Sequence, residues 1–182
     1  MQRSLSLGAM IVIGLLARAG MGATYTFNKI LDSGHSVPNG QAPNFSAVSL
    51  AAVDGPSTAF VGSFNDGVAS YSGLYRLDSG VITTIADPTV TAPGGGGTFK
   101  SVVASGDYSG GIMVFAATTA DGTQGLYRYD NGAVSLLIRQ GDVLPGGTST
   151  LVSFPARGVA GNATDYAFGA HRSDDTDGMY TT

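Results

Sequence analysis

The segment GLYRYDNGAVSLLIRQGDVLPGG, residues 125–147, restates GLYRLDSGVITTIADPTVTAPGG, residues 73–95, at an offset of 52 residues. A period of this size is typical of repeat proteins, in which one supersecondary unit packs on its own copies. Within each segment, two short apolar runs are separated by a turn sequence, DSG at 78–80 and DNG at 130–132. Asn-Gly is a strong hairpin signal because both residues tolerate positive φ. Each segment is therefore predicted to contain a tight antiparallel hairpin.

The composition favours β structure. All thirteen acidic residues are Asp, and 28 of the 182 residues are Gly, so turn formers are plentiful and strong helix formers are scarce. A chain of this length suffices for one domain, which buries on the order of 70% of its unfolded surface. The hydrophobic fraction of 43% excludes a disordered polar tract. Since the chain has no Cys, packing rather than disulfides must stabilise it.

Residues 1–23 have the order of a secretory signal peptide: a basic residue, an apolar run over 5–16, and small residues up to Ala23. The apolar run is short for a membrane span, although a retained anchor helix is the alternative. We expect cleavage after Ala19 or Ala23. The mature protein is then expected outside the cell or at its surface, with the periplasm as an alternative, and without a membrane span.

Signal cleavage also changes the charge. Loss of Arg3 and Arg18 moves the net charge from −4 to −6. Phosphate binding requires basic patches, which such a surface lacks, so no nucleic-acid partner is expected.

One complete unit is predicted over residues 44–98, with four short strands rich in Val, Ile, Thr, Phe and Tyr and bounded by Gly, Pro, Asp or Asn. The strands are NFSAVSLAAVDG (44–55), STAFVGSF (57–64), SGLYRLD (72–78) and GVITTIAD (80–87).

The same order recurs over residues 99–150. A third unit, 151–182, contains the first three strands but no fourth. Residues 24–43 align with the fourth strand and its following loop, with no other strands before them. The domain is thus predicted to span 24–182, and the N-terminal strand is expected to complete the third unit.

A four-stranded antiparallel unit of about 50 residues is the period of a kelch-type blade. The predicted fold class is therefore all-β and β-propeller-like, with two complete units and one composite or truncated unit. Rings usually contain roughly four to eight blades. We therefore expect the chain to be a fragment that is incomplete at its C-terminus; the alternatives are an oligomer of complete chains, or an open array.

The pattern GLYR (73–76 and 125–128) followed by PGG (93–95 and 145–147) resembles that of a family of secreted bacterial repeat proteins of unknown function, often found with PEP-CTERM sorting tails. The resemblance covers nearly the whole mature chain and rests on structural residues. It implies a propeller-like fold and a cell-surface location, and it implies no activity. The 182 residues contain no sorting tail, which agrees with the expectation of a fragment.

The glycine-rich run GGGGTFKS, residues 94–101, superficially resembles a phosphate-binding loop. Phe99 stands where that motif requires Gly before Lys, and the run precedes a predicted strand rather than a helix. It is interpreted as a connecting loop.

The acidic stretch SDDTDG, residues 173–178, resembles the start of a calcium loop and makes Asp175 and Asp177 candidate Ca²⁺ ligands. Ser173 occupies the first position instead of Asp, and no Glu follows. The corresponding loops of the other units also carry Asp-Gly, so a recurring turn is the preferred interpretation. No other cofactor is predicted.

The sequence predicts no catalytic residue. His35 and His171 are far apart, with no Cys, Glu or third His to complete a site for a first-row metal. There is no Gly-x-Ser-x-Gly motif and no thiol nucleophile. Paired Asp residues can cleave glycosidic bonds, but here nearly all of them fall at predicted turns or strand ends.

The third strands carry repeated Tyr and Arg side chains. Alternation places Tyr75 and Arg76 on opposite faces of one strand, and Tyr127 and Arg128 on opposite faces of the next. These four residues are candidates for a ligand platform around the array. The preferred alternative is that the tyrosines pack between units.

Two functions remain. The first is a secreted, non-catalytic module for binding or scaffolding, whose partner is a glycan or protein at the cell surface or in the extracellular matrix. The alternative is an exported propeller-type polysaccharide hydrolase or lyase that uses loop Asp residues. An enzyme would bring two or three Asp or His side chains together in one pocket, whereas a module would spread them over turns.

Overall fold

The computed structural model describes residues 28–155, 158–161 and 164–181, and it is all-β, as the composition predicts. The predicted signal peptide, residues 1–23, lies outside the described residues. One 3₁₀ turn, η1 (Pro38–Gly40), precedes the strands. The strands are β1 (Ala47–Asp54), β2 (Ser57–Asn65), β3 (Ser70–Asp78), β4 (Val81–Ala86), β5 (Phe99–Ser109), β6 (Ile112–Thr119), β7 (Gln124–Asp130), β8 (Ala133–Arg139), β9 (Leu151–Ser153), β10 (Val159–Gly161), β11 (Tyr166–Arg172) and β12 (Asp177–Thr181).

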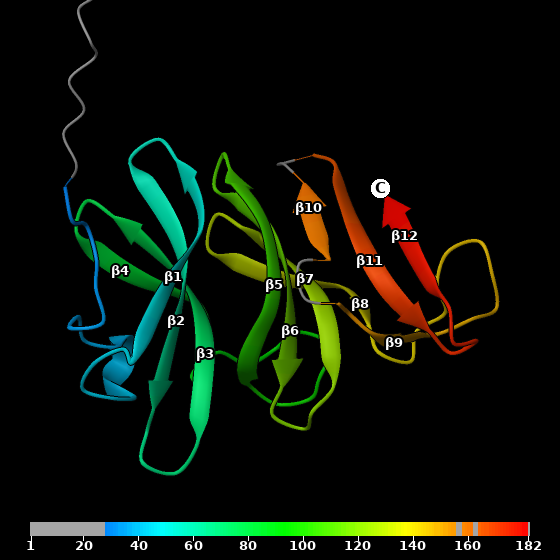
Figure 1. Cartoon of the computed structure of the whole chain (residues 1–182), viewed down its shortest axis with the longest axis horizontal. Helices are drawn as coiled ribbons and strands as arrows, with labels where there is room; N and C mark the ends of the chain where they lie inside the picture. Colours follow the sequence, from blue (N-terminus) through cyan, green and yellow to red (C-terminus); the bar gives the residue numbers. More distant parts are fainter. Residues whose placement is uncertain (1–27, 156–157, 162–163, 182) are drawn as a thin grey trace, which may run out of the picture.

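The strands form three antiparallel meanders that lie side by side (Figure 1). Unit 1 contains β1 to β4, unit 2 contains β5 to β8, and unit 3 contains β9 to β12, where β9 and β10 both pair with β11. The predicted hairpins are present, because Asp78 pairs with Val81 and Asp130 with Ala133. Both DSG and DNG turns use positive φ, at Ser79 (49°) and Asn131 (46°).

The units contact one another mainly through their first strands and their sheet faces. β1 lies against β5, and β5 lies against β10. One parallel bridge, Ser72 to Ser101, joins β3 of unit 1 to β5 of unit 2. Next to it, the Val102 amide donates to Ser72 Oγ at 3.1 Å. The two units therefore share one eight-stranded sheet, while unit 3 forms a separate four-stranded sheet.

Alternation along the strands gives each unit two apolar faces, because successive side chains point to opposite sides of a sheet. The aromatic face carries two Phe and one Tyr. The aliphatic face carries Leu or Met from the third strand and Ala, Val or Gly from the second. The aromatic sets are Phe45, Phe60 and Tyr75 in unit 1, Phe99, Phe115 and Tyr127 in unit 2, and Phe154, Phe168 and Tyr180 in unit 3.

The main cores lie between units. The aromatic face of unit 2 packs on the aliphatic face of unit 1, where Ala59 and Leu74 are completely buried. The aromatic face of unit 3 packs in the same way on Val114, Ala116 and Leu126 of unit 2. Each interface thus repeats the same contact between an aromatic face and an aliphatic face.

The N-terminal segment differs from the prediction. Residues 28–32 form no strand, and among the described residues β12 pairs only with β11. The segment lies beside unit 1, at the opposite end of the array from β12 (Figure 1). Its Leu31 and Val37 pack instead on the aromatic face of unit 1. The expectation that this segment supplies a fourth strand to unit 3 is therefore wrong for residues 28–43.

The part of the chain that the structure describes contains no helix with the length and apolar character needed to cross a membrane.

Candidate functional site

The proposed tyrosine platform is a packing element. Tyr75 and Tyr127 are 0% and 2% exposed, so a ligand cannot reach either ring in this structure. Each ring stacks on the Phe directly opposite it on the second strand, Phe60 at a centroid distance of 5.5 Å and Phe115 at 5.6 Å. Tyr180 makes the corresponding stack with Phe168 at 5.3 Å.

A glycine two residues before each Tyr makes room for its ring. A Cβ atom placed on Gly73 would lie 2.5 Å from the Tyr75 hydroxyl, and one on Gly125 would lie 2.7 Å from the Tyr127 hydroxyl. Residues i and i+2 share one face of a strand, so the ring folds back over the glycine. The Gly-Leu-Tyr motif thus encodes packing. Tyr127 packs between units, as the preferred interpretation states, whereas Tyr75 packs beneath the N-terminal segment on the outer side of unit 1.

The two platform arginines are in different surroundings. Arg76 lies at the boundary between units 1 and 2, where hydrogen bonding to Tyr108 of β5 raises its pKa. Arg128 forms a half-buried ion pair with Asp130 at 3.0 Å. The structure therefore does not place the four platform residues on one accessible surface.

The calcium candidates lie around a histidine. Asp177 Oδ1 is 2.9 Å from His171 Nδ1, and Asp175 Oδ1 is 3.5 Å from His171 Nε2. The two carboxylates thus contact opposite nitrogens of the imidazole ring. Across residues 28–155, 158–161 and 164–181, no group of three or more His, Cys, Asp or Glu side chains is arranged to hold a metal ion.

A continuous layer of turns and linkers, called the loop rim here, runs across all three units at one end of their strands. It consists of the β2–β3, β6–β7 and β11–β12 turns with the linkers 87–98 and 140–150. Each linker binds the turn of the following unit: the Ala120 amide donates to Thr98 O at 2.8 Å, and Ser149 Oγ donates to Asp174 Oδ2 at 2.8 Å. The glycine-rich run at 94–101 belongs to this layer and leads directly into β5, as predicted.

Each turn of the loop rim has an Asp that binds its own turn. Asp66 Oδ1 accepts the Val68 and Ala69 amides, both at 2.8 Å, and Asp121 Oδ1 accepts the Thr123 amide at 2.9 Å. Asp174 Oδ1 accepts the Thr176 hydroxyl. These hydrogen bonds hold the pKa of all three carboxyls below the ordinary value, because they favour the charged form.

Asp87 is a buried carboxylate that the sequence analysis did not single out. It accepts the Thr89 amide at 2.8 Å and the Thr89 hydroxyl at 2.6 Å, and the Tyr75 hydroxyl donates to it at 3.3 Å. Burial and the Asp87 charge raise the pKa of Tyr75. Arg139 occupies the aligned position in the next unit, so a comparison of the two units does not predict the contact between Tyr75 and Asp87. The Asp-x-Thr spacing at 87–89 was the available signal, because Asp side chains bind backbone amides two residues on.

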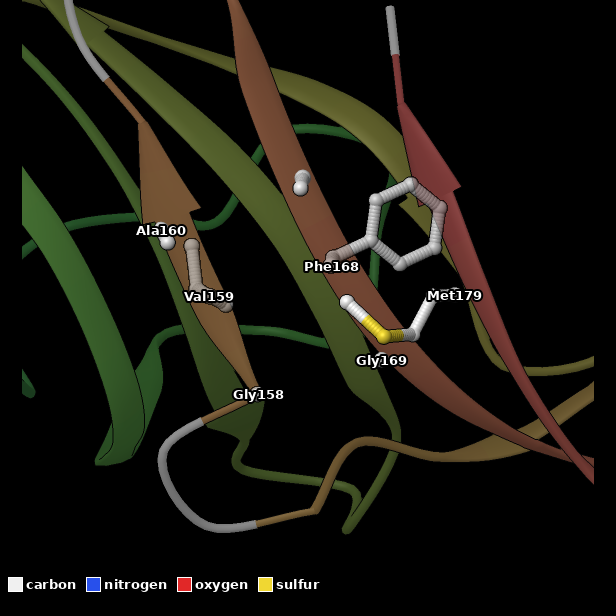
Figure 2. Close-up of a pocket in the computed structure, with 7 residues that line it drawn as sticks. Gly158, Val159, Ala160, Phe168, Gly169 and Met179 are labelled. Carbon is white, nitrogen blue, oxygen red and sulfur yellow. The ribbon is translucent and has the colours of Figure 1, made fainter.

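The aliphatic face of unit 3 is open and contains a hollow of about 220 Å³ (Figure 2). Figure 2 shows Met179 of β12 extending beside Gly169 of β11, with Ala160 on β10. Met179 is 83% exposed, whereas Leu74 and Leu126, at the same place in units 1 and 2, are completely buried. No sequence signal distinguished this face, because its residues follow the same pattern as the covered faces.

Comparison with known proteins gives a family but no function. No match was found among curated proteins or among solved structures. The model of a family described as "Family of unknown function (DUF7453)" matches residues 10–179. This agrees with the predicted membership in a family of unknown function, whereas secretion and the family's association with sorting tails stay predictions. On the extent of this match, the chain belongs to the DUF7453 family of unknown function.

Proposed function

We propose that this chain is a secreted, non-catalytic repeat module that binds or scaffolds at the cell surface or in the extracellular matrix, and that its units are propeller-type blades. One observation carries the non-catalytic part: Asp66, Asp121 and Asp174 lie on three separate turns of the loop rim, and each binds the backbone or a hydroxyl of its own turn. Such carboxylates position loops, whereas an enzyme brings its acid and base together in one pocket.

The loop rim supports the binding part of the proposal. Binding residues are often found on loops that a rigid scaffold positions, and here hydrogen bonds between linkers and turns fix the layer from one unit to the next. The rim displays hydroxyl, amide and carboxylate groups, which suit hydroxyl-rich ligands such as glycans.

The test uses the exported chain with insoluble polysaccharides and cell-surface preparations. Co-sedimentation measures binding, and an assay for new reducing ends measures cleavage. We expect retention on at least one material without new reducing ends. Retention on none would contradict the binding proposal, and release of reducing ends would support the alternative of a polysaccharide hydrolase; eliminative cleavage, followed by ultraviolet absorbance, would support a lyase.

A matched pair of variants tests whether the loop rim, and not the opposite rim, is the binding surface. Asp175→Lys changes the charge of an exposed side chain on the loop rim, and Asp107→Lys makes the same change near the opposite rim, beside the β5–β6 turn. We expect the first variant to alter retention and the second to leave it unchanged. Equal effects would argue against the loop rim as the binding surface.

A further inference from the structure

The two ends of the array expose the two halves of the interface that recurs between its units. At one end is the aliphatic face of unit 3, called the unit 3 outer face; at the other is the uncovered part of the aromatic face of unit 1, called the unit 1 outer face. The unit 3 outer face consists of Ala160, Ala167, Gly169 and Met179. The unit 1 outer face consists of Ile30, Val48 and Leu50, which surround the buried Thr58 and Phe60.

Strand pairing shows what the unit 3 outer face corresponds to. The stacked pairs Phe60–Tyr75 and Phe168–Tyr180 lie directly opposite each other on the second and third strands of their units, so they fix the alignment. In this alignment, the unit 3 outer face occupies the places of Ala52, Ala59, Val61 and Leu74 in unit 1. All four of those residues belong to the core between units 1 and 2.

The unit 1 outer face corresponds to the other side of that core. Val48 and Thr58 occupy the places of Val102 and Met113, which pack against unit 1 from unit 2. Here a hollow of about 150 Å³ remains, and Leu50 is 68% exposed. In Figure 1 these strands lie at the far end of the array from β12.

We infer that copies of this chain associate head to tail, with the unit 3 outer face of one copy on the unit 1 outer face of the next. The established contact between units shows what covers an aliphatic face, namely the aromatic face of the next unit. In a second copy the rings of that face in unit 1 are already buried beneath the N-terminal segment, and the part that stays open to a partner is the apolar edge at Val48 and Leu50. Exposed apolar patches of this kind mark association sites. A heterologous contact extends into a ring or a filament. The inference rests on the proposed scaffolding function and names its partner.

The internal interface also predicts the register of this contact. Asp177 and Ala47 occupy the places of Ser72 and Ser101, the residues of the parallel bridge between units 1 and 2. Both Asp177 and Ala47 are exposed. Head-to-tail association should therefore place Asp177 of one copy beside Ala47 of the next.

The first experiment measures molar mass against concentration by sedimentation equilibrium. We expect the wild-type chain to form species larger than one chain. Met179→Lys and Leu50→Lys, each alone, should weaken association by at least about tenfold, because an unpaired ammonium would be buried. Val68→Lys, on the exposed β2–β3 turn away from both faces, is the matched control and should associate as wild type.

Mixing the two face variants gives the decisive result. Met179→Lys retains an intact unit 1 outer face and Leu50→Lys retains an intact unit 3 outer face, so an equimolar mixture should form two-chain species that grow no further. A wild-type chain that stays monomeric at all concentrations would overturn the inference. An equimolar mixture of the two variants that stays monomeric, although each variant has the melting temperature of the wild type, would also overturn it.

A cross-linking test needs no disruptive charge. The chain has no cysteine, so Asp177→Cys and Ala47→Cys each introduce a single thiol. Oxidising their mixture should give disulfide-linked dimers, because the parallel bridge brings the corresponding Cα atoms within disulfide range. Equal cross-linking of Asp177→Cys with itself would indicate a symmetric contact and would contradict head-to-tail packing. A wild-type chain that stays monomeric but is retained on glycan would overturn this inference and leave the binding proposal standing, whereas a chain that associates but is retained on no material would do the reverse.

Discussion

Leu126 and Met179 occupy the same place in successive units, yet Leu126 is completely buried and Met179 is 83% exposed. Both follow a glycine, precede a tyrosine and point away from the stacked Phe–Tyr pair. The difference arises because unit 3 covers Leu126, while no described residue covers Met179. In this array, a side chain is buried only when a neighbouring unit packs on it. Its position in its own strand is not sufficient.

The largest effect expected from this comparison is on stability. Leu126→Ala should lower the free energy of unfolding by about 2–5 kcal/mol, because it removes buried methyl groups and leaves a cavity. Met179→Ala should change it by less than about 0.5 kcal/mol, as is usual for exposed sites. Urea unfolding at low protein concentration, where the chains are monomeric, measures both. Equal costs would show that the unit 3 outer face is covered in the isolated chain.

A smaller effect is expected at the glycines beneath the tyrosine rings. Gly73→Ala should cost about 1–3 kcal/mol, because the new methyl group would overlap the ring of Tyr75, which is fully buried and cannot move aside. Gly178→Ala should cost less, because Tyr180 is only partly buried and can rotate away. Urea unfolding measures both changes.

A second-site change checks the cause of the glycine effect. Combining Gly73→Ala with Tyr75→Val removes the overlap, so the two costs should not add. Additive costs would show that the glycine is required for backbone conformation and not for the ring.

The sequence predicted most of the strands because their pattern is local. Alternating apolar residues and Asp-Gly or Asn-Gly turns located both complete meanders and the third strand of unit 3. The packing of Tyr127 between units was also predicted as the preferred alternative to a ligand platform, because units that stack need large apolar side chains at their contacts. Tyr75 is buried as well, but it packs beneath the N-terminal segment and not between units.

The errors and omissions concern tertiary contacts. Residues 24–43 align with a fourth strand, but a strand needs a partner edge, and residues 28–32 lie beside unit 1 without one. The hollow at Gly169 depends on what covers unit 3, which the pattern of unit 3 does not encode. The buried Asp87 has no Asp at the aligned position of the next unit, so a comparison of the repeats could not identify it as a buried residue.

The smallest effect is expected where the three units are alike, at the Asp residues of the loop rim. The pKa values of Asp66, Asp121 and Asp174 are lowered in the folded state, so these carboxylates stabilise the fold above their unfolded pKa of about 3.9. That contribution is lost as the pH falls through the folded pKa. Asp→Asn variants should therefore melt below wild type at pH 7, and the difference should disappear towards pH 2.

Thermal melting between pH 7 and pH 2 measures this effect in each unit. Since Asp174 lies in the unit whose outer face is open and Asp121 in a unit covered on both sides, similar pH profiles would show that the turns are independent of the packing between units. A difference that grows as the pH falls would contradict the lowered pKa values. A pH profile of melting that is shifted only for Asp174→Asn would instead show that the open face weakens the adjacent turn. Covered and open units would then differ in the stability of their loop-rim turns as well as in their cores.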